Sequence, residues 1–309
     1  MNLLNMDGIA TPTKRLVSGA DPKEWVTLGG DQYLMKWGKQ RNELAPFSEF
    51  VASRFLRYMN IPVQTVELVI YKDSVCAMCS DIGTIKQFAD ISESSLDTDK
   101  NDKVYILEDI LHEIASMRKF TPEQRTEIAT IFKRVFLCDA VLANRDRHAG
   151  NWGYRDTGDF CPIYDNGASL FPGLLHNEEP NLKRLYHILT IEEPRSQVQI
   201  RAQNGKLKKL NYHHLLTDTE LITEELNWIK KANVPEAINW AVAPLPPEMA
   251  RHYHYVMYLR YYCIIEREDF NDVFKRLTSL SYEAPSSVHD ILEWASNMPL
   301  NGVGESVQR

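Results

Sequence analysis

The sequence has 309 residues, of which 44% are hydrophobic and 25% are charged, as is typical of a soluble globular protein that can bury a core. Its net charge of −7 at pH 7 disfavours a protein built mainly to hold nucleic acid, because neutralising phosphates requires clustered Lys and Arg. No apolar run approaches the about 20 residues of a membrane span, and the N-terminus lacks the basic-then-apolar pattern of a signal peptide.

The beginning of the chain is predicted to form a small β-rich unit that carries one helix. Residues 25–37 indicate two short strands around a Gly-Gly-Asp turn, and residues 63–71 and 74–78 indicate two more. Between them, residues 46–60 have apolar side chains at helical spacing, so we predict a helix there. We assign residues 1–82 to an N-terminal lobe.

The remainder of the chain, residues 83–309, is predicted to form a larger and mainly helical C-terminal lobe. Residues 92–102 are polar and acidic and indicate an exposed loop. Thr121 begins a long helix with a capping box to Gln124, and that helix should end near Asn144. A short strand followed by a turn is expected in residues 159–171. Further helices are predicted at residues 218–232, 247–266 and 286–297.

The segment of residues 144–153, Asn-Arg-Asp-Arg-His-Ala-Gly-Asn-Trp-Gly, contains the most informative pattern. Asp146 and Asn151 are five residues apart, the interval at which the catalytic loop of protein kinases places its base and a magnesium ligand. Asp165 follows in Asp-Asn-Gly and matches the metal-binding Asp of kinases. Each fragment alone is more often a surface ion pair or a plain turn. Their order and context together favour phosphoryl transfer.

Two features of the first lobe independently favour a nucleotide site. Lys36 lies inside an apolar strand, and Glu49 lies in the helix that follows; such a pair holds the ATP phosphates in kinases. The alternative is an edge strand whose Lys36 reaches out to solvent. Upstream, residues 18–23 form a small-residue turn in which Ser18, Gly19, Ala20 and Lys23 could fold over phosphates. It lacks the Gly-x-Gly-x-x-Gly pattern.

Other candidate residues carry weaker signals. Cys79 and Asp81 end an apolar strand that could lead into an interlobe hinge, where backbone groups bind adenine. Cys76 and Cys79 form a Cys-x-x-Cys pair, but no second pair has zinc-finger spacing. The five cysteines are widely spaced, which favours reduced thiols and a cytoplasmic protein. His148 could order the catalytic loop or could be an exposed loop residue.

With these residues identified, the chain resembles the HipA-like kinases, in particular the compact members of that family. The resemblance is carried by the segments at residues 18–23, 33–36, 47–52, 144–153 and 162–169. It implies an α+β, bilobal, protein-kinase-like fold and an ATP- and Mg²⁺-dependent Ser/Thr protein kinase. Asp146 would be the base, Lys36 would bind phosphate, Glu49 would pair with Lys36, and Asn151 and Asp165 would hold the magnesium ion.

The resemblance also carries expectations about regulation and partners. It implies autophosphorylation, with Ser18 as the candidate regulatory site, because a phosphate there would compete with ATP for the same cleft. The role would be that of a toxin-type growth regulator with an antitoxin partner, or of an effector secreted into a host cell. The substrate would be a protein, either an aminoacyl-tRNA synthetase or a host protein. The alternatives are a small-molecule kinase, of the aminoglycoside or lipid kinase type, and a nucleotide-binding pseudokinase that acts through protein contacts.

Overall fold

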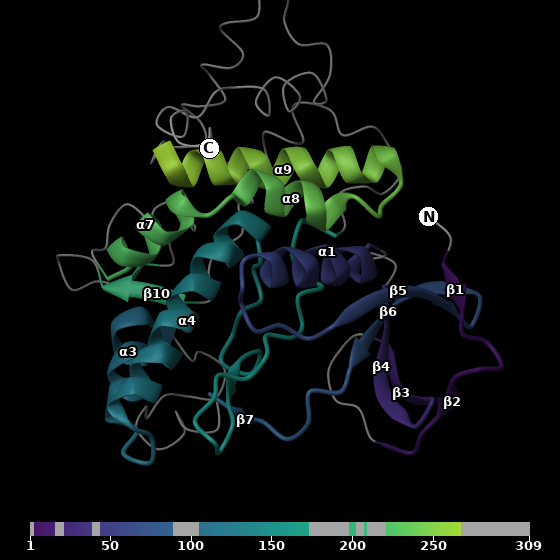
Figure 1. Cartoon of the computed structure of the whole chain (residues 1–309), viewed down its shortest axis with the longest axis horizontal. Coiled ribbons are helices and arrows are strands. Elements are labelled where there is room, and N and C mark those ends of the chain that lie inside the picture. Colours follow the sequence, from purple (N-terminus) through teal and green to yellow (C-terminus); the bar gives the residue numbers. More distant parts are fainter. Residues whose placement is uncertain are drawn as a thin grey trace, which may run out of the picture.

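The computed structural model describes residues 3–15, 22–38, 44–88, 105–172, 198–201, 207–208 and 221–266. Within them, a curled sheet lies on one side and a group of helices on the other (Figure 1). The fold is therefore mixed α+β with two lobes. The predicted boundary after residue 82 falls between strand β6 (Ser74–Ser80) of this sheet and the short strand β7 (Lys86–Gln87), which pairs with β9 (Gly153–Tyr154).

The curled sheet is the core of the first lobe. In spatial order, its strands are β1 (Leu4–Asn5), β5 (Val66–Tyr71), β6, β4 (Asp31–Trp37), β3 (Lys23–Leu28) and β2 (Thr11–Pro12). All neighbouring pairs are antiparallel except β1 and β5. The predicted hairpin of β3 and β4 turns at Gly29 and Gly30, whose φ angles of 62° and 96° lie in the left-handed region that glycine adopts without strain. In this register Lys36 lies opposite Ala77 of β6.

Helix α1 (Ala45–Tyr58) confirms the helix predicted for residues 46–60. Its apolar face, which includes Phe50, Val51 and Phe55, is buried in the main hydrophobic core against the sheet. The same face also buries Ser48, Glu49 and Ser53. Because a buried charge is costly without a partner, Glu49 indicates a polar interaction beneath the helix.

The second lobe is helical. Its helices among the described residues are α3 (Leu107–Ser116), α4 (Pro122–Leu142), α7 (Thr223–Lys231), α8 (Val234–Val242) and α9 (Pro247–Glu266). The predicted capping box is present, because the Thr121 hydroxyl accepts from Gln124 N at 3.3 Å while Gln124 Oε1 accepts from Thr121 N at 3.0 Å. Helix α4 ends at Ala143, whose φ of 52° turns the chain into the Asn144 segment.

Several predicted elements differ from the structure. Residues 159–171 contain only isolated bridges at Phe160 and Ile163, since Pro162 between them has no amide hydrogen to continue a ladder. Helix α7 starts at Thr223 rather than at 218, and α8, capped by Asn233, was not predicted. The sequence also did not predict the small sheet of β8 (Tyr105–Ile106), β10 (Val198–Arg201) and β11 (Leu207–Lys208). The predictions for residues 92–102 and 286–297 lie outside the described residues.

The two lobes are held together on both sides of α1. Gln64 N donates to Ile163 O at 2.9 Å, which ties the segment before β5 to the second lobe. On the other side, Arg54 of α1 donates to Trp240 O at 2.7 Å and to Ala241 O at 3.2 Å, at the end of α8. Its guanidinium also lies 3.8 Å from the centre of the Trp240 ring. Helix α1 is thus anchored to both lobes.

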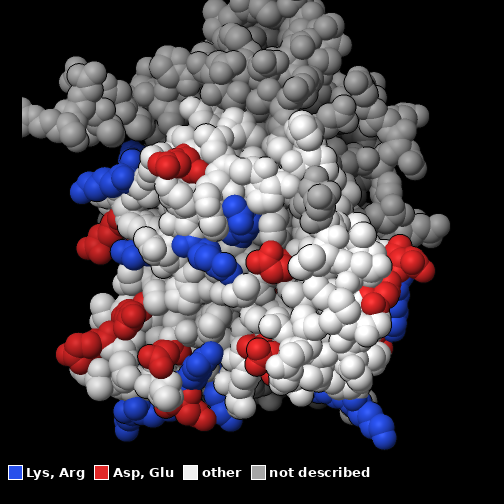
Figure 2. Space-filling model, turned by 45° about the vertical axis from the view of Figure 1, so that its right-hand side comes forward, with Lys and Arg blue, Asp and Glu red and all other residues white. Residues whose placement is uncertain are grey.

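Acidic and basic side chains are interspersed on the face drawn in Figure 2, without a continuous patch of one sign among the described residues. A uniformly basic surface, which nucleic acid would require, is not found on this face. None of the helices in the described part of the chain combines the length and the apolarity needed to cross a membrane.

Candidate active site

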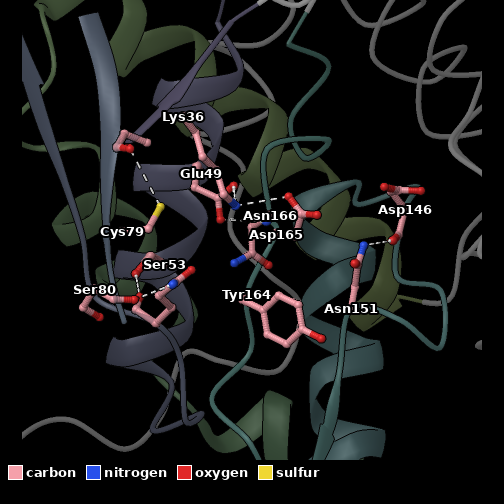
Figure 3. Close-up of polar contacts among 12 residues, drawn as sticks. Lys36, Glu49, Ser53, Cys79, Ser80, Asp146, Asn151, Tyr164, Asp165 and Asn166 are labelled. Carbon is pink, nitrogen blue, oxygen red and sulfur yellow. Dashed lines mark hydrogen bonds and ion pairs between the residues drawn. The ribbon is translucent and has the colours of Figure 1, made fainter. Parts of the chain in front are cut away.

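Lys36 is the centre of a charge cluster that joins the two lobes. Its Nζ lies 3.1 Å from Glu49 Oε2 and 3.1 Å from Asp165 Oδ1 (Figure 3). The side chain is 14% exposed. Burial lowers its pKa, but the charges of Glu49 and Asp165 outweigh burial and leave the pKa of Lys36 raised. Lys36 is therefore a permanently charged ammonium held between two carboxylates.

Glu49 connects the helix, the strand and the segment after Asp165. Its side chain is 2% exposed, and its second oxygen, Oε1, accepts from Asn166 N at 2.8 Å. A Cβ atom at Gly167 would lie 3.3 Å from Glu49 Oε2, a tight contact that favours glycine there. The carboxylate thus uses both oxygens to fix the position of the Asp-Asn-Gly turn.

Asp165 occupies a strained backbone position. Its φ is 59°, in the left-handed region, which Asp tolerates better than most residues. The charge of Lys36 is the main cause that holds the pKa of the Asp165 carboxyl below its usual value, although burial opposes it. The side chain remains 42% exposed. Asp165 is therefore an ionised, accessible carboxylate whose direction is set by the turn.

Asp146 and Asn151 are brought together by the loop after α4. Asn151 Nδ2 donates to Asp146 O at 2.7 Å, and Asp146 N donates to Asn144 Oδ1 at 3.0 Å (Figure 3). Burial raises the pKa of the Asp146 carboxyl; the charge of His148 lowers it and that of Asp165 raises it further. Because the donor end of the Asn151 amide is used on the backbone, its oxygen end is the one suited to a cation.

Arg147 holds the loop from behind, a role that the sequence did not predict. Its side chain is 3% exposed and forms an ion pair with Asp139 of α4, from Nε at 2.9 Å and from Nη2 at 3.1 Å. It also donates to the carbonyls of Asn151 and Tyr164 and to Asn166 Oδ1. One available signal was Asp139 itself, a charge inside the apolar end of a helix that requires a partner.

A cavity of about 520 Å³ lies beside these groups. Its lining residues are Arg15, Lys23, Trp25, Leu34, Lys36, Gln64, Asp81, Ile82, Gly83, Ile85, Gln87, His148, Gly150, Asn151, Tyr164 and Asp165. The predicted residues Lys23, Lys36, Asp81, His148, Asn151 and Asp165 therefore meet at one cavity.

The other predicted site residues lie elsewhere. Glu49 and Asp146 are not among the lining residues and reach the cavity wall through Lys36 and Asn151. Cys79 is fully buried in β6, where burial raises the pKa of its thiol, so its side chain is not in a position to touch a ligand. Ser18, Gly19 and Ala20 lie outside the described residues.

His148 orders the turn of the loop after α4. Its Nδ1 accepts from Gly150 N at 3.0 Å, and its own amide donates to Asp146 O at 2.8 Å. Tyr164 supports the same turn from the other wall, because its hydroxyl donates to Gly150 O at 2.6 Å. Asp81 forms an ion pair with Arg15 at 2.7 Å on the cavity wall.

Known proteins are similar to this chain in sequence and fold. No family model matches the chain. It is 27% identical to the serine/threonine-protein kinase CtkA of Helicobacter pylori over 190 residues, an alignment that covers 56% of this chain and 55% of that protein. The crystal structure of a Helicobacter pylori proinflammatory kinase CtkA matches with a TM-score of 0.66 and 22% identity, over 86% of this chain and 98% of that one.

A second structure comes from the Shewanella oneidensis toxin–antitoxin system HipA, in complex with HipB and operator DNA. It matches with a TM-score of 0.53 and 14% identity, over 84% of this chain and 66% of that one. These matches support a HipA-like kinase family. The structural match to CtkA also supports a bilobal kinase-like fold, as the sequence predicted. The aligned part of the chain spans about half the length of the curated relative, CtkA.

The residues of this candidate site fit ATP and magnesium. The cavity volume lies in the usual range for small-molecule sites, and Lys23 and Lys36 are cations suited to phosphates. Among the described residues, no group of three or more His, Cys, Asp or Glu could hold a metal ion by itself. Magnesium typically takes one or two carboxylates and completes its shell with water and phosphates, so Asp165 with Asn151 fits an ion that binds together with a nucleotide.

Proposed function

We propose that the chain is an ATP- and Mg²⁺-dependent Ser/Thr protein kinase. The observation that carries this proposal is the placement of Lys36 between Glu49 and Asp165 on a cavity that Asn151 also lines. A lysine that is held by a helix carboxylate, beside a second and accessible carboxylate, is the phosphate-binding arrangement of kinases. The similarity to a curated Ser/Thr kinase supports the same reaction.

Each residue has a distinct role in the proposed transfer. Lys36 and Lys23 would bind the phosphates. Asp165 and Asn151 would hold magnesium, which when bound supplies positive charge against the phosphate oxygens. The acceptor hydroxyl oxygen would bond to the γ-phosphorus as the bond from that phosphorus to the β-γ bridging oxygen breaks and ADP leaves with that oxygen. Asp146 would orient the hydroxyl and take its proton.

The surroundings of Asp146 suit such a base. Its raised pKa makes the carboxylate a better proton acceptor than an ordinary aspartate. Arg147 is a positioning residue in this proposal, because it binds the carbonyl of Asn151 and the turn before Asp165 from behind.

Incubation with γ-labelled ATP, magnesium and a cell lysate tests the proposal. We expect the intact protein to label protein acceptors, and we expect Asp146→Asn, which keeps the shape of the side chain, to reduce labelling at least about 100-fold while still binding ATP. Label found only in small molecules would favour a small-molecule kinase. Nucleotide binding without any transfer would favour a pseudokinase, and equal transfer by Asp146→Asn would contradict the assigned base.

We also propose that the chain phosphorylates itself at Ser18. The segment that contains Ser18 lies in the chain between Arg15 and Lys23, and both of these residues line the cavity. A phosphate there would add nearly two negative charges that Arg15 or Lys23 could bind in place of ATP. Mass spectrometry after incubation with Mg-ATP should find a phosphate on Ser18, and Ser18→Ala should prevent slow self-inactivation. If the intact protein loses activity over time while the peptide that contains Ser18 stays unmodified, this role of Ser18 is contradicted.

The proposed biological role is that of a toxin-type regulator or an effector. The structural neighbour HipA occurs in a complex with HipB and operator DNA, and this supports an antitoxin partner for the toxin role. The relative CtkA of Helicobacter pylori is a proinflammatory kinase, which supports the effector role. The toxin role predicts that expression in bacteria arrests growth and that co-expression of a helix-turn-helix protein encoded by a neighbouring gene relieves the arrest. Equal effects of the intact protein and Asp146→Asn on growth would contradict the toxin role.

A further inference from the structure

Gln64 is a buried polar residue on the cavity wall to which neither the sequence nor the proposed reaction gives a role. It is 4% exposed and lines the same cavity as Lys36 and Asp165. It precedes β5, in the segment that connects the two lobes.

The backbone and side chain of Gln64 are held by three neighbouring elements. Its amide donates to Ile163 O at 2.9 Å, and its carbonyl accepts from Ser53 Oγ of α1 at 2.6 Å. Its side-chain Nε2 donates to Ser80 O at 2.6 Å, at the end of β6; Ser53 and Ser80 lie close to each other in Figure 3. Because a carbonyl can only accept, the Ser80 contact fixes which end of the carboxamide is the nitrogen. The oxygen, Oε1, must then lie at the other end.

This oxygen has no hydrogen-bond partner among the described residues, although it is buried. Buried polar atoms of native proteins nearly always have a partner, so an unpaired acceptor of a residue that lines a cavity marks a position for a donor from a ligand. The donor chemistry that fits is an N–H group, because the oxygen of a neutral amide accepts but does not donate.

The neighbouring wall fits a flat aromatic base. The cavity has an apolar set of lining residues, Trp25, Leu34, Ile82 and Ile85, in addition to its charged set. Ile82 follows closely on Ser80, whose carbonyl Gln64 binds. A base that packs between apolar side chains would place its edge groups near the end of β6, while its phosphates extend to the lysines.

We propose that Gln64 Oε1 accepts a hydrogen bond from the exocyclic amine of a 6-aminopurine and makes the site selective for adenine over 6-oxopurine nucleotides. In a 6-oxopurine, the amine is replaced by a carbonyl, and two acceptors would then face each other. This inference rests on the proposed function, because it assumes that the cavity binds a purine nucleotide. We expect ATP to bind on the order of 10- to 100-fold more tightly than inosine triphosphate.

Calorimetric titration of the full chain in magnesium tests this inference with nucleotides that differ only at position 6. ATP, inosine triphosphate and the N6,N6-dimethyl derivative of ATP are compared. The dimethyl derivative has no N–H at this position, so we expect it to lose most of the preference shown for ATP. This comparison needs no mutation and therefore does not depend on how a variant folds.

Gln64→Met then assigns the preference to the residue, because Met has a similar length and lacks the carboxamide. We expect the ratio of ATP to inosine triphosphate affinity to fall toward one, mainly through weaker ATP binding. Gln87→Met is the matched control: Gln87 lines the same cavity, and its Nε2 donates to Gly150 O and to the Tyr164 hydroxyl. It should change both affinities by a similar factor and leave their ratio intact. Thermal unfolding without nucleotide checks that both variants fold.

The outcomes separate the two proposals. Failure of the intact protein to bind any of the nucleotides would overturn the proposed function and, with it, the role of Gln64. Equal affinity for ATP and inosine triphosphate, or a preference that Gln64→Met leaves unchanged, would overturn the role of Gln64 and leave the kinase proposal standing.

Discussion

Lys36 lines the candidate active site whereas Arg147 lies behind the loop after α4, and the two residues hold their partners in different ways. Lys36 contacts two carboxylates, of which Asp165 is 42% exposed. The five N–H donors of Arg147 have five acceptors, and Arg147 and Asp139 are 3% and 1% exposed. Lys36 can therefore exchange a protein partner for a ligand, whereas Arg147 cannot without breaking the fold.

The largest expected effect is on stability, from Arg147→Met. The substitution leaves the Asp139 carboxylate buried without its ion-pair partner and with only the hydrogen bond from Asn144 Nδ2, and removing one partner of such a pair costs about 3–5 kcal/mol. Chemical denaturation should show this loss. The control is Arg145→Met, an exposed arginine of the same loop, which should change stability by about 0.5 kcal/mol or less. Similar losses for the two variants would contradict the role of Arg147 as the buried anchor of this loop.

Lys36→Met should destabilise less and inactivate more directly. We expect a loss of about 1–3 kcal/mol, because Glu49 loses its partner but keeps the hydrogen bond from Asn166 N. Adding Glu49→Gln should recover part of this stability without recovering ATP binding, which calorimetry measures. Lys72→Met, which removes an exposed lysine of the same sheet, should leave ATP binding unchanged. Normal ATP affinity in Lys36→Met would rule out Lys36 as the phosphate ligand.

A smaller effect should distinguish Asp165→Ala from Asp165→Asn. Both remove the carboxylate and should abolish magnesium-dependent ATP binding. Only Ala is strained at a φ of 59°, because Asn adopts the left-handed region more readily, so Ala should be less stable by about 1 kcal/mol. Equal unfolding midpoints would show that the turn relaxes, and retained magnesium dependence in either variant would exclude Asp165 as a ligand.

The smallest expected effect is on the pH dependence of the reaction. A base acts when deprotonated, and because the pKa of Asp146 is raised, the acid limb of kcat/KM should lie above the ordinary range of an aspartate. The charge of His148 lowers that pKa, so His148→Ala should move the limb to higher pH. A pH–rate profile measures both. A limb that stays in place in His148→Ala would mean that another group sets it.

The pKa of Asp165 is shifted in the opposite direction to that of Asp146, and this shift should appear in the stability of the protein at acid pH. Its folded pKa lies below the ordinary value, so its contribution to stability is present above the unfolded pKa and is lost as the pH falls through the folded pKa. Lys36 has a raised pKa, so its contribution is present below the ordinary lysine value and is lost only in strong alkali. Between these limits, neither group should change the free energy of unfolding with pH. Asp165→Ala and Asp165→Asn lack this carboxylate, so in acid their free energy of unfolding should depend less on pH than that of the intact protein.

The same contrast explains how much of the site could be predicted from the sequence. Lys36 and Glu49 could be found because each breaks a local apolar pattern, one in a strand and one in a helix. Asp146 and Asn151 follow from their spacing. The partner of Arg147 lies in α4 and depends on how the loop folds back, which no local pattern encodes. Gln64 was missed for a similar reason, since its significance comes from an unpaired oxygen in three dimensions.

Fold prediction had corresponding strengths and limits. The hairpin, α1, α4 and α9 have strong periodicity or clear caps and were predicted close to their observed positions. Helix α8 was missed because it is short, has Pro235 in its first turn and is followed by a segment that contains prolines. The strands of the small sheet are two to four residues long, too short to show alternation.

The anchoring of α1 by Arg54 bears on how activity could be switched. Many kinases turn off by swinging the helix that carries the glutamate away from the lysine. Here such a swing would break the hydrogen bonds from the Arg54 guanidinium to the carbonyls of Trp240 and Ala241, and its contact with the Trp240 ring. In the proposed kinase, Arg54 therefore holds α1 in the orientation in which Glu49 contacts Lys36, and a change at the end of α8 would loosen that orientation.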